Sequence, residues 1–202
     1  MTTFKDEIIN VITGIPFLTS YEQIDKLEKI NGVLISDIEN DAKPNRYSAS
    51  GFLGSDEKLL QVLKTDWKIV ESFNTTHQIL ATHLANIISI AIDTPIIEPF
   101  KPVTITYATS PTKNPIPFNV SLMSTRGWQY DLFQPSQGQQ REMKTPDKWC
   151  DDNLITNLNN NTSAKLTLGS LSYIYQMGFY EGGGNNNSYR NDPNNLIKLL
   201  EL

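Results

Sequence analysis

The spacing of apolar residues changes along this chain, and that change limits the fold class more than any other feature of the sequence. Between residues 55 and 92 apolar side chains recur every three or four positions, as on one face of an α-helix. Between residues 103 and 122 they alternate with polar side chains, as in a strand with one buried face. Helical spacing returns between residues 193 and 200. We therefore predict an α+β fold: a helical N-terminal half, a small antiparallel sheet in the middle and C-terminal helices packing on it.

Two long helices are the clearest elements of the N-terminal half. The first starts near Ser55, whose hydroxyl can cap it, and its apolar stripe continues to Val70. The second starts at a capping box that opens with Thr75, and it ends near Asp93. Because this second helix is apolar around most of its circumference, we expect it to lie at the centre of the fold.

The segments before these helices carry weaker signals. Residues 3–12 and 20–30 have the apolar spacing of short helices, and Val33 to Ile35 is expected to be a short strand. Residues 36–54 are mostly polar and contain one proline and two glycines, so we predict a loop there.

The strands of the middle region are predicted from alternation. Residues 103–107 and 118–122 form a wide hairpin, because three prolines separate them. Residues 128–132 are expected to extend a third strand. Residues 154–158 and 166–168 are expected to pair across an asparagine-rich turn.

Two helices are predicted to close the chain. One runs from about Ser170 to Met177 and is capped by Gly178. The last has Asp192 at its cap and Pro193 at its first position, which is the preferred arrangement at a helix start. We expect the apolar residues from Leu59 to Leu200 to collapse around one shared interior.

Size and composition favour one folded unit. The chain has 202 residues, of which 39% are apolar, enough to build a core. We therefore predict a single domain over residues 1–202, with residues 1–50 as a peripheral helical and loop subdomain.

Charge and residue types restrict the partners. The net charge is −5 with no basic block, and no second helix follows the Thr76 helix as in a helix-turn-helix, so we expect no nucleic-acid partner. Apolar runs are too short to cross a membrane. The chain has one cysteine and no N-terminal secretory signal, so a cytoplasmic location is expected. We expect no cofactor and leave homo-oligomer formation open.

Histidines and carboxylates are the candidates for chemistry. His77 and His83 lie six residues apart on one helix and therefore point to different faces, so they do not form a metal site. His77 is the stronger catalytic candidate, together with a carboxylate from distant sequence such as Asp131 or Glu181. Both histidines also fit a purely structural role, and no metal ligands are assigned.

The nucleophile candidates are weak. No Gly-X-Ser-X-Gly elbow is present, and Ser170, which follows Gly169, fits a helix cap better than a nucleophile. Cys150 lies beside Asp151 and Asp152, whose charges disfavour a thiolate.

Aromatic residues mark two candidate ligand or interface segments. In the first, Tyr180 and Glu181 leave one helix, and Tyr189 and Arg190 enter the next. Arg190 pairing with Glu181 would make a structural clasp, and the alternative is that both line a ligand pocket. The second segment holds Trp128 and Tyr130, which we interpret as core or interface residues of a strand.

Five short motifs spread over residues 66 to 200 resemble a family of uncharacterised bacterial proteins. They are Asp66-Trp67 with Val70-Glu71, Thr76-His77 with Leu80-Ala81, Ile155 to Leu158, Gly178 to Gly183, and Tyr189 to Pro193. The resemblance implies no activity. It does imply that the C-terminal two thirds form one integrated unit.

Two classes of function follow from these observations. The first is a cytoplasmic binding or accessory module without catalysis, whose partner is an unidentified protein or small molecule. It rests on the lack of a catalytic motif and on aromatics suited to an interface. The alternative is a small hydrolase-type enzyme that joins His77 with a sequence-distant carboxylate, which motif reading would not detect.

Overall fold

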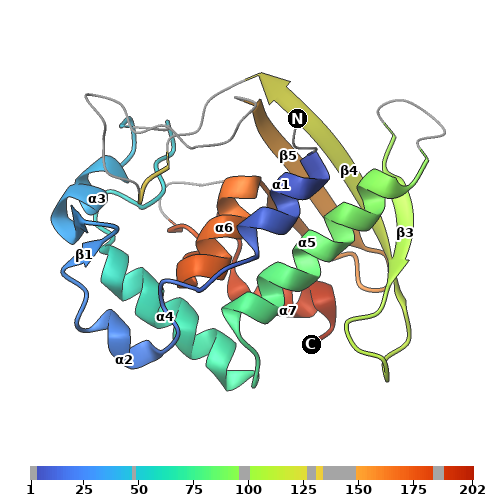
Figure 1. The fold of residues 1–202 in the computed structure, drawn as a ribbon, viewed down its shortest axis with the longest axis horizontal. Coiled ribbons are helices and arrows are strands. Elements are labelled where there is room, and N and C mark those ends of the chain that lie inside the picture. Colours follow the sequence, from blue (N-terminus) through green and yellow to red (C-terminus); the bar gives the residue numbers. More distant parts are fainter. Residues whose placement is uncertain (1–3, 47–48, 96–100, 127–130, 134–148, 184–188) are drawn as a thin grey trace.

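The chain folds into helices and strands that a computed structural model describes over residues 4–46, 49–95, 101–126, 131–133, 149–183 and 189–202 (Figure 1). These residues contain helices α1 (Phe4–Val11), α2 (Tyr21–Ile24), α3 (Ile35–Asp41), α4 (Leu59–Ser72), α5 (His77–Asp93), α6 (Leu168–Met177) and α7 (Pro193–Leu200). They also contain strands β1 (Lys29–Ile30), β2 (Val33–Leu34), β3 (Val103–Tyr107), β4 (Ile116–Arg126), β5 (Trp149–Asn157) and β6 (Ser163–Leu166).

Four of the strands form one antiparallel sheet in the order β3-β4-β5-β6, so strands that are consecutive in sequence are neighbours in space. The register pairs Ile105 with Phe118, and it pairs Ile155 with both Val120 and Ala164. All five side chains are buried. Because alternate residues of a strand face opposite sides, these positions form the inner face of the sheet. Along the sequence, the strands of this sheet follow helices α1 to α5 and precede helices α6 and α7. This order of helices and strands confirms the predicted α+β fold.

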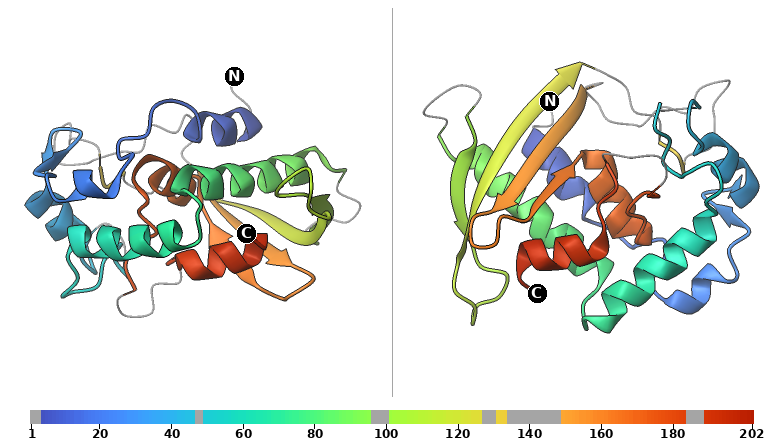
Figure 2. Two further views of the ribbon diagram at one scale, coloured as in Figure 1. Left: turned by 90° about the horizontal axis from the view of Figure 1, so that it is seen from below. Right: turned by 180° about the vertical axis from the view of Figure 1, so that it is seen from behind.

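Helices cover the inner face of the sheet in two layers. α5 contacts β3 and β4, α6 contacts β6, and α7 contacts β5 and β6. α1 packs on α5 and α6 on the side away from the sheet, as the edge-on view in Figure 2 shows. α5 therefore lies between α1 and the sheet, which agrees with the central position predicted from its apolar surface.

The buried apolar residues form two clusters, which corrects the prediction of one shared interior. The first cluster fills the space between the sheet, α5 and α7, and the second lies under α2, α3 and the start of α4. Two helices contribute to both: α4 through Val70 and Trp67, and α6 through Ile174 and Tyr173. The clusters are therefore joined by shared helices. The single domain over residues 1–202 stays a prediction.

The N-terminal predictions were partly wrong, and turn chemistry explains why. Instead of a helix over residues 20–30, α2 is one turn long, and Asn31 and Gly32 have φ angles of 49° and 82°. Two successive residues with positive φ make a tight hairpin turn, and this turn pairs β1 with β2. The predicted loop over 36–54 begins with α3, which buries Ile38 in the second cluster.

The cap and strand positions also differ in detail. Lys58 is the N-cap of α4, not Ser55, and Thr167 is the N-cap of α6, so Ser170 lies in the first turn. Asp192 and Pro193 start α7 as predicted. The third strand of the sheet is β5; most of the strand predicted at 128–132 lies outside the described residues.

Asparagines at the end of β5 and in the turn after it cap the last helix. The Asn157 side chain donates to the carbonyl of Leu199 at 2.8 Å, and that of Asn160 donates to the carbonyl of Lys198 at 2.9 Å. The last carbonyls of a helix have no partner within the helix. The abundance of asparagine in this part of the chain therefore has a structural role.

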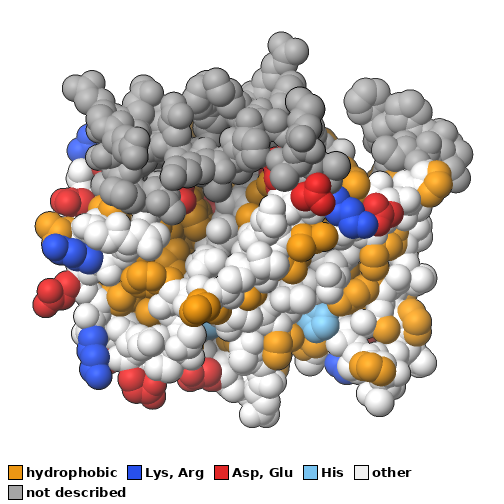
Figure 3. All heavy atoms as spheres, viewed as in Figure 1, with side chains coloured by type: hydrophobic (Ala, Val, Ile, Leu, Met, Phe, Trp, Pro, Cys, Tyr) orange, Lys and Arg blue, Asp and Glu red, His pale blue; other side chains and the backbone are white. Residues whose placement is uncertain are grey.

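The described surface mixes charges of both signs. On the face shown in Figure 3, acidic and basic side chains lie mostly at the edges, and hydrophobic side chains are scattered among uncharged ones. The basic side chains on this face do not gather into one patch over the described residues. The expectation that the chain binds no nucleic acid stays a prediction.

Within the described residues, no helix combines the length and the apolar character that crossing a membrane would require.

Candidate ligand-binding site

The chain turns sharply at the end of α6 and then runs through three buried residues. Gly178 ends the helix in the left-handed conformation, with φ 67°. Phe179 then packs into the second hydrophobic cluster, and Tyr180 packs into the first. Glu181 follows these two residues directly and is also buried.

Glu181 combines burial with a strained backbone. Its residue is only 6% exposed, and its φ is 65°, a value that residues with a side chain rarely adopt. Such a conformation costs about 1–3 kcal/mol and persists only where the surrounding structure enforces it. Strained residues of this kind cluster at functional sites, which makes Glu181 the leading candidate for a functional residue.

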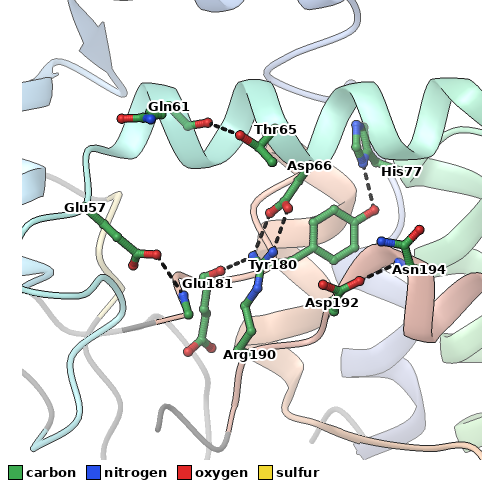
Figure 4. Close-up of polar contacts among 11 residues, drawn as sticks. Glu57, Gln61, Thr65, Asp66, His77, Tyr180, Glu181, Arg190, Asp192 and Asn194 are labelled. Carbon is green, nitrogen blue, oxygen red and sulfur yellow. Dashed lines mark hydrogen bonds and ion pairs between the residues drawn. The ribbon is translucent and has the colours of Figure 1, made fainter. Parts of the chain in front are cut away.

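One side of the Glu181 backbone is held by an ion pair. The Arg190 guanidinium donates to both carboxylate oxygens of Asp66, each at 2.7 Å, and also to the Glu181 carbonyl (Figure 4). Asp66 is fully buried on α4. The clasp predicted between Arg190 and Glu181 thus exists through the Glu181 backbone, and Asp66 supplies the carboxylate. In Figure 4 the Glu181 carboxylate points away from the guanidinium.

The other side of Glu181 is held by the loop before α4. The N–H of Gly182 donates to the carbonyl of Phe52 at 2.6 Å, and the N–H of Gly183 donates to the Glu57 carboxylate at 3.1 Å. A Cβ on Gly182 would lie 2.9 Å from the Leu53 Cα, so the two segments approach too closely for any side chain at 182. Glu181 is therefore anchored from both directions.

A cavity of about 290 Å³ opens beside Glu181. It lies between the Gly51–Phe52 loop, the first turn of α6 and the segments around Glu181 and Tyr189. Its volume is close to the lower end of the range for small-molecule pockets, about 300–1,000 Å³. The described lining residues are Ala49, Ser50, Gly51, Phe52, Asp152, Thr167, Gly169, Ser170, Tyr173, Glu181 and Tyr189.

A second carboxylate, that of Asp152, lines the cavity from β5. It pairs with the ammonium of Lys165 at 2.9 Å, and that ammonium also donates to the Tyr189 hydroxyl at 3.1 Å. The neighbouring Asp151 faces the opposite side of the strand and accepts a hydrogen bond from the N–H of Leu168 at the start of α6. Burial raises the pKa of the Asp151 carboxyl. The adjacent aspartates therefore have separate roles and do not converge on one cation.

His77 is not among the residues that line this cavity. It is 2% exposed, its Nδ1 lies 2.7 Å from the Tyr180 hydroxyl, and its ring packs on Trp67 with centroids 4.3 Å apart. Nε2 has no hydrogen-bond partner among the described residues. Burial lowers the pKa of His77 to about 3, so the ring is neutral at physiological pH. His77 and Tyr180 thus form a buried structural pair in the described structure.

The remaining predicted site residues lie apart from one another. The Asp131 carboxylate accepts a hydrogen bond from the N–H of Phe133 at 3.0 Å, within a turn near Tyr173. Trp128 and Tyr130 lie outside the described residues. Of the predicted residues, Glu181 and Tyr189 both line the cavity. Arg190 does not line it but donates to the Glu181 carbonyl.

Several cavity residues gave no functional signal in the sequence. Phe52 lies in a segment that looked like an exposed loop, yet it is 4% exposed. Ser170 and Thr167 carry the signature of a helix start, which is common and says nothing about a ligand. The positive φ of Glu181 depends on tertiary contacts, so no local sequence pattern predicts it.

No group of three or more His, Cys, Asp or Glu side chains in the described part of the chain is arranged to hold a metal ion. Comparison with known proteins found no matching family model, and neither a curated protein nor a solved structure is significantly similar to the chain. The resemblance to a bacterial family therefore stays a prediction.

Proposed function

We propose that this protein is a binding module for a small polar molecule, which it holds in the cavity beside Glu181. The observation that carries the proposal is the state of Glu181 itself. Glu181 is a buried acidic residue with a strained backbone, it is anchored through its own backbone carbonyl and through the next two residues, and it lines a cavity of about 290 Å³. The anchoring contacts offset the cost of the strain, and a ligand contact gives a reason to keep it.

The groups around the cavity suit a polar ligand. Hydroxyl-bearing side chains of Ser50, Thr167, Ser170 and Tyr189 line it together with the carboxylates. Small-molecule sites typically combine apolar walls with a few polar groups that fix orientation, and here Phe52 and Tyr173 supply apolar surface.

The contacts favour a binding module over the His77 hydrolase. A general base must reach the proton it removes, and His77 is enclosed between Trp67 and Tyr180. Its lowered pKa also makes it a poor base near neutral pH. We propose a cytoplasmic site of action, which the presence of a single cysteine in 202 residues supports.

A thermal-shift screen tests the proposal. Wild-type protein is heated with a panel of small polar metabolites of positive, negative and zero charge. A true ligand raises the melting temperature increasingly as its concentration exceeds its Kd. Ala49→Trp provides a cavity-blocking variant, because Ala49 is exposed at the cavity and the indole would enter it without removing a buried contact.

We expect at least one compound to stabilise the wild type and to have a much smaller effect on Ala49→Trp. Glu71→Gln is the matched control, because Glu71 is exposed on α4 and does not line the cavity. The proposal fails if no compound in the panel stabilises the wild type. It also fails if the stabilising compounds act equally on the wild type and the blocked variant.

A further inference from the structure

The two edges of the four-stranded sheet differ in their hydrogen bonds. At the β6 edge, the side-chain amide of Asn195 donates to the carbonyl of Ser163 at 2.8 Å, and that of Asn191 donates to the carbonyl of Lys165 at 2.9 Å. The β6 edge is therefore covered by the start of α7 and the residues before it. At the other edge, β3 forms one margin of the described sheet (Figure 1), and among the described residues no side chain bonds to its backbone in this way.

The alternation of the backbone fixes which groups of β3 point outward. The N–H of Leu158 donates to the carbonyl of Pro117 at 2.9 Å, so the backbone polar groups of Pro117 face β5. Those of the next residue, Phe118, therefore face β3. It follows that the N–H and C=O groups of Thr104 and Thr106 point away from β4, and they make no hydrogen bond to another segment of the described chain. Such a row of unpaired groups is a template for a further strand.

The β3 edge also carries no formal charge. No residue from Pro102 to Ser110 is acidic or basic, and the side chains of Thr104 and Thr106 are exposed. Proteins often protect an edge strand with lysines, with a proline or with an inward-pointing charge. The only proline nearby, Pro102, precedes the strand and lies outside its paired residues. Two copies of this edge can therefore approach each other without placing like charges opposite one another.

The sequence of β3 makes this edge complementary to itself. When two copies run antiparallel about a two-fold axis at Ile105, each Thr104 lies opposite a Thr106, and their outward N–H and C=O groups exchange two hydrogen bonds. In the same register Val103 lies opposite Tyr107. Pairs of threonines, and pairs of a β-branched with an aromatic residue, are stabilising cross-strand combinations. All the outward polar groups of both threonines are satisfied by this one arrangement.

We propose that two copies of this chain associate through β3, which joins their four-stranded sheets into one continuous antiparallel sheet. The proposal is independent of the proposed ligand binding, because no residue of β3 is among the described residues that line the cavity. β3 has 5 residues, whereas a standard interface has about 20–30 residues on each side. We therefore expect a reversible dimer with a Kd in the micromolar range.

Sedimentation equilibrium and amide hydrogen exchange of the full chain test the proposal together. Both are measured between about 5 µM and about 500 µM protein, the range in which a weak dimer forms. We expect the mass to rise with concentration from that of one chain towards that of two. Over the same range the N–H groups of Thr104 and Thr106 should exchange severalfold more slowly, whereas that of Ile105, which already faces β4, should change much less.

Charge variants identify the residues that meet. Thr104→Lys/Thr106→Lys places lysines opposite lysines in the dimer, and Thr104→Glu/Thr106→Glu does the same with carboxylates, so each should associate about tenfold more weakly or worse. An equimolar mixture of the two variants places lysines opposite glutamates and should restore association as a heterodimer. Met123→Lys/Leu158→Lys is the matched control for the lysine variant, because it adds the same charge at two exposed positions outside β3. Its Kd should equal that of the wild type.

A wild-type chain that stays monomeric at about 500 µM overturns the proposal, whatever other strand the edge then accepts. A dimer that leaves the exchange of Thr104 and Thr106 unchanged, or that persists in the lysine variant, has its interface elsewhere and overturns it as well. The mixture keeps the test valid if the charged variants are less stable than the wild type. Two folded variants that each stay monomeric and also fail to associate when mixed contradict the register centred on Ile105.

Discussion

Arg190 follows Asp66 by 124 residues in the sequence, yet its two terminal nitrogens each donate a 2.7 Å hydrogen bond to a separate oxygen of the Asp66 carboxylate. Asp66 is fully buried. The planar guanidinium matches the carboxylate in this two-point geometry, which a lysine ammonium cannot reproduce. The pair connects α4 with the segment that enters α7, and through the Glu181 carbonyl it also connects both to the cavity.

Breaking this ion pair should be strongly destabilising. Asp66→Asn leaves the Arg190 charge without its partner, and we expect the free energy of unfolding to fall by about 3 kcal/mol. Arg190→Gln should cost a similar amount. Because the two residues act as a pair, the double variant should lose clearly less than the sum of the single losses. Urea unfolding at pH 7 measures all four proteins, and additive losses would contradict the assigned pairing.

His77 should make stability depend on pH. Burial lowers the pKa of His77 to about 3 from 6.5, so below pH 6.5 the unfolded chain binds a proton that the folded chain excludes. The contribution is therefore complete above about pH 6.5 and is lost as the pH falls towards 3, by about 1.4 kcal/mol per pH unit. Between pH 7.5 and 5.0 the wild type should lose about 2 kcal/mol more than His77→Gln.

Other groups titrate in the same pH range. The test therefore compares how steeply the free energy of unfolding changes with pH in the two proteins, and not its value at one pH. Glutamine at position 77 offers Tyr180 an acceptor and carries no charge at any of these pH values. Parallel pH profiles for the wild type and His77→Gln would show that His77 is not excluded from protonation in the folded state.

Gly178→Ala should lower the free energy of unfolding by much more than the left-handed conformation of this residue alone explains. A Cβ at 178 would lie 2.5 Å from Trp67 Nε1 and 2.7 Å from His77 Nε2. Gly32→Ala is the matched control, because Gly32 also has positive φ but a Cβ there would meet no atom within 4 Å. The control should lose about 1–2 kcal/mol from conformation, and Gly178→Ala should lose about 1–3 kcal/mol more from overpacking. Equal losses by urea unfolding would refute the close approach.

Asn157→Ala tests the capping of α7. The Asn157 residue is fully buried, its amide donates to the Leu199 carbonyl, and its oxygen accepts from the N–H of Asn159. Alanine would leave buried groups without partners, at about 1–3 kcal/mol. Asn160→Ala removes the exposed bond to the Lys198 carbonyl and the bond that its side-chain oxygen accepts from the N–H of Thr162, and it should cost about 1 kcal/mol. Hydrogen exchange of the last turn of α7 should accelerate in Asn157→Ala, and unchanged protection would argue against this cap.

The sequence predicted elements wherever apolar spacing and turn chemistry agreed. The alternation around Ile105 and Phe118 placed β3 and β4, and Asp192 with Pro193 placed the start of α7. The prediction from sequence failed at Asn31. A hairpin turn there was interpreted as the end of a helix, because both structures favour Asn-Gly. Local pattern alone does not decide which of them forms.

The sequence predicted only some of the residues of the candidate site. Glu181, Tyr189 and Arg190 were singled out because they flank a glycine-rich turn, and the structure places Glu181 and Tyr189 at one cavity. The partners Asp66 and Phe52 could not be found, because they approach Glu181 only after α4 and its preceding loop pack against the C-terminal segment. The conformation of Glu181 depends on those long-range contacts.

The central claim is that the Glu181 carboxylate forms part of a cavity that receives a ligand. A crystal structure of the wild-type protein soaked in the compound that stabilises it most in the metabolite screen tests this claim most directly. We expect density for that compound beside Glu181 and Phe52, with the φ of Glu181 still positive. A cavity filled by protein side chains, or a Glu181 whose carboxylate faces solvent with an ordinary negative φ, would contradict it.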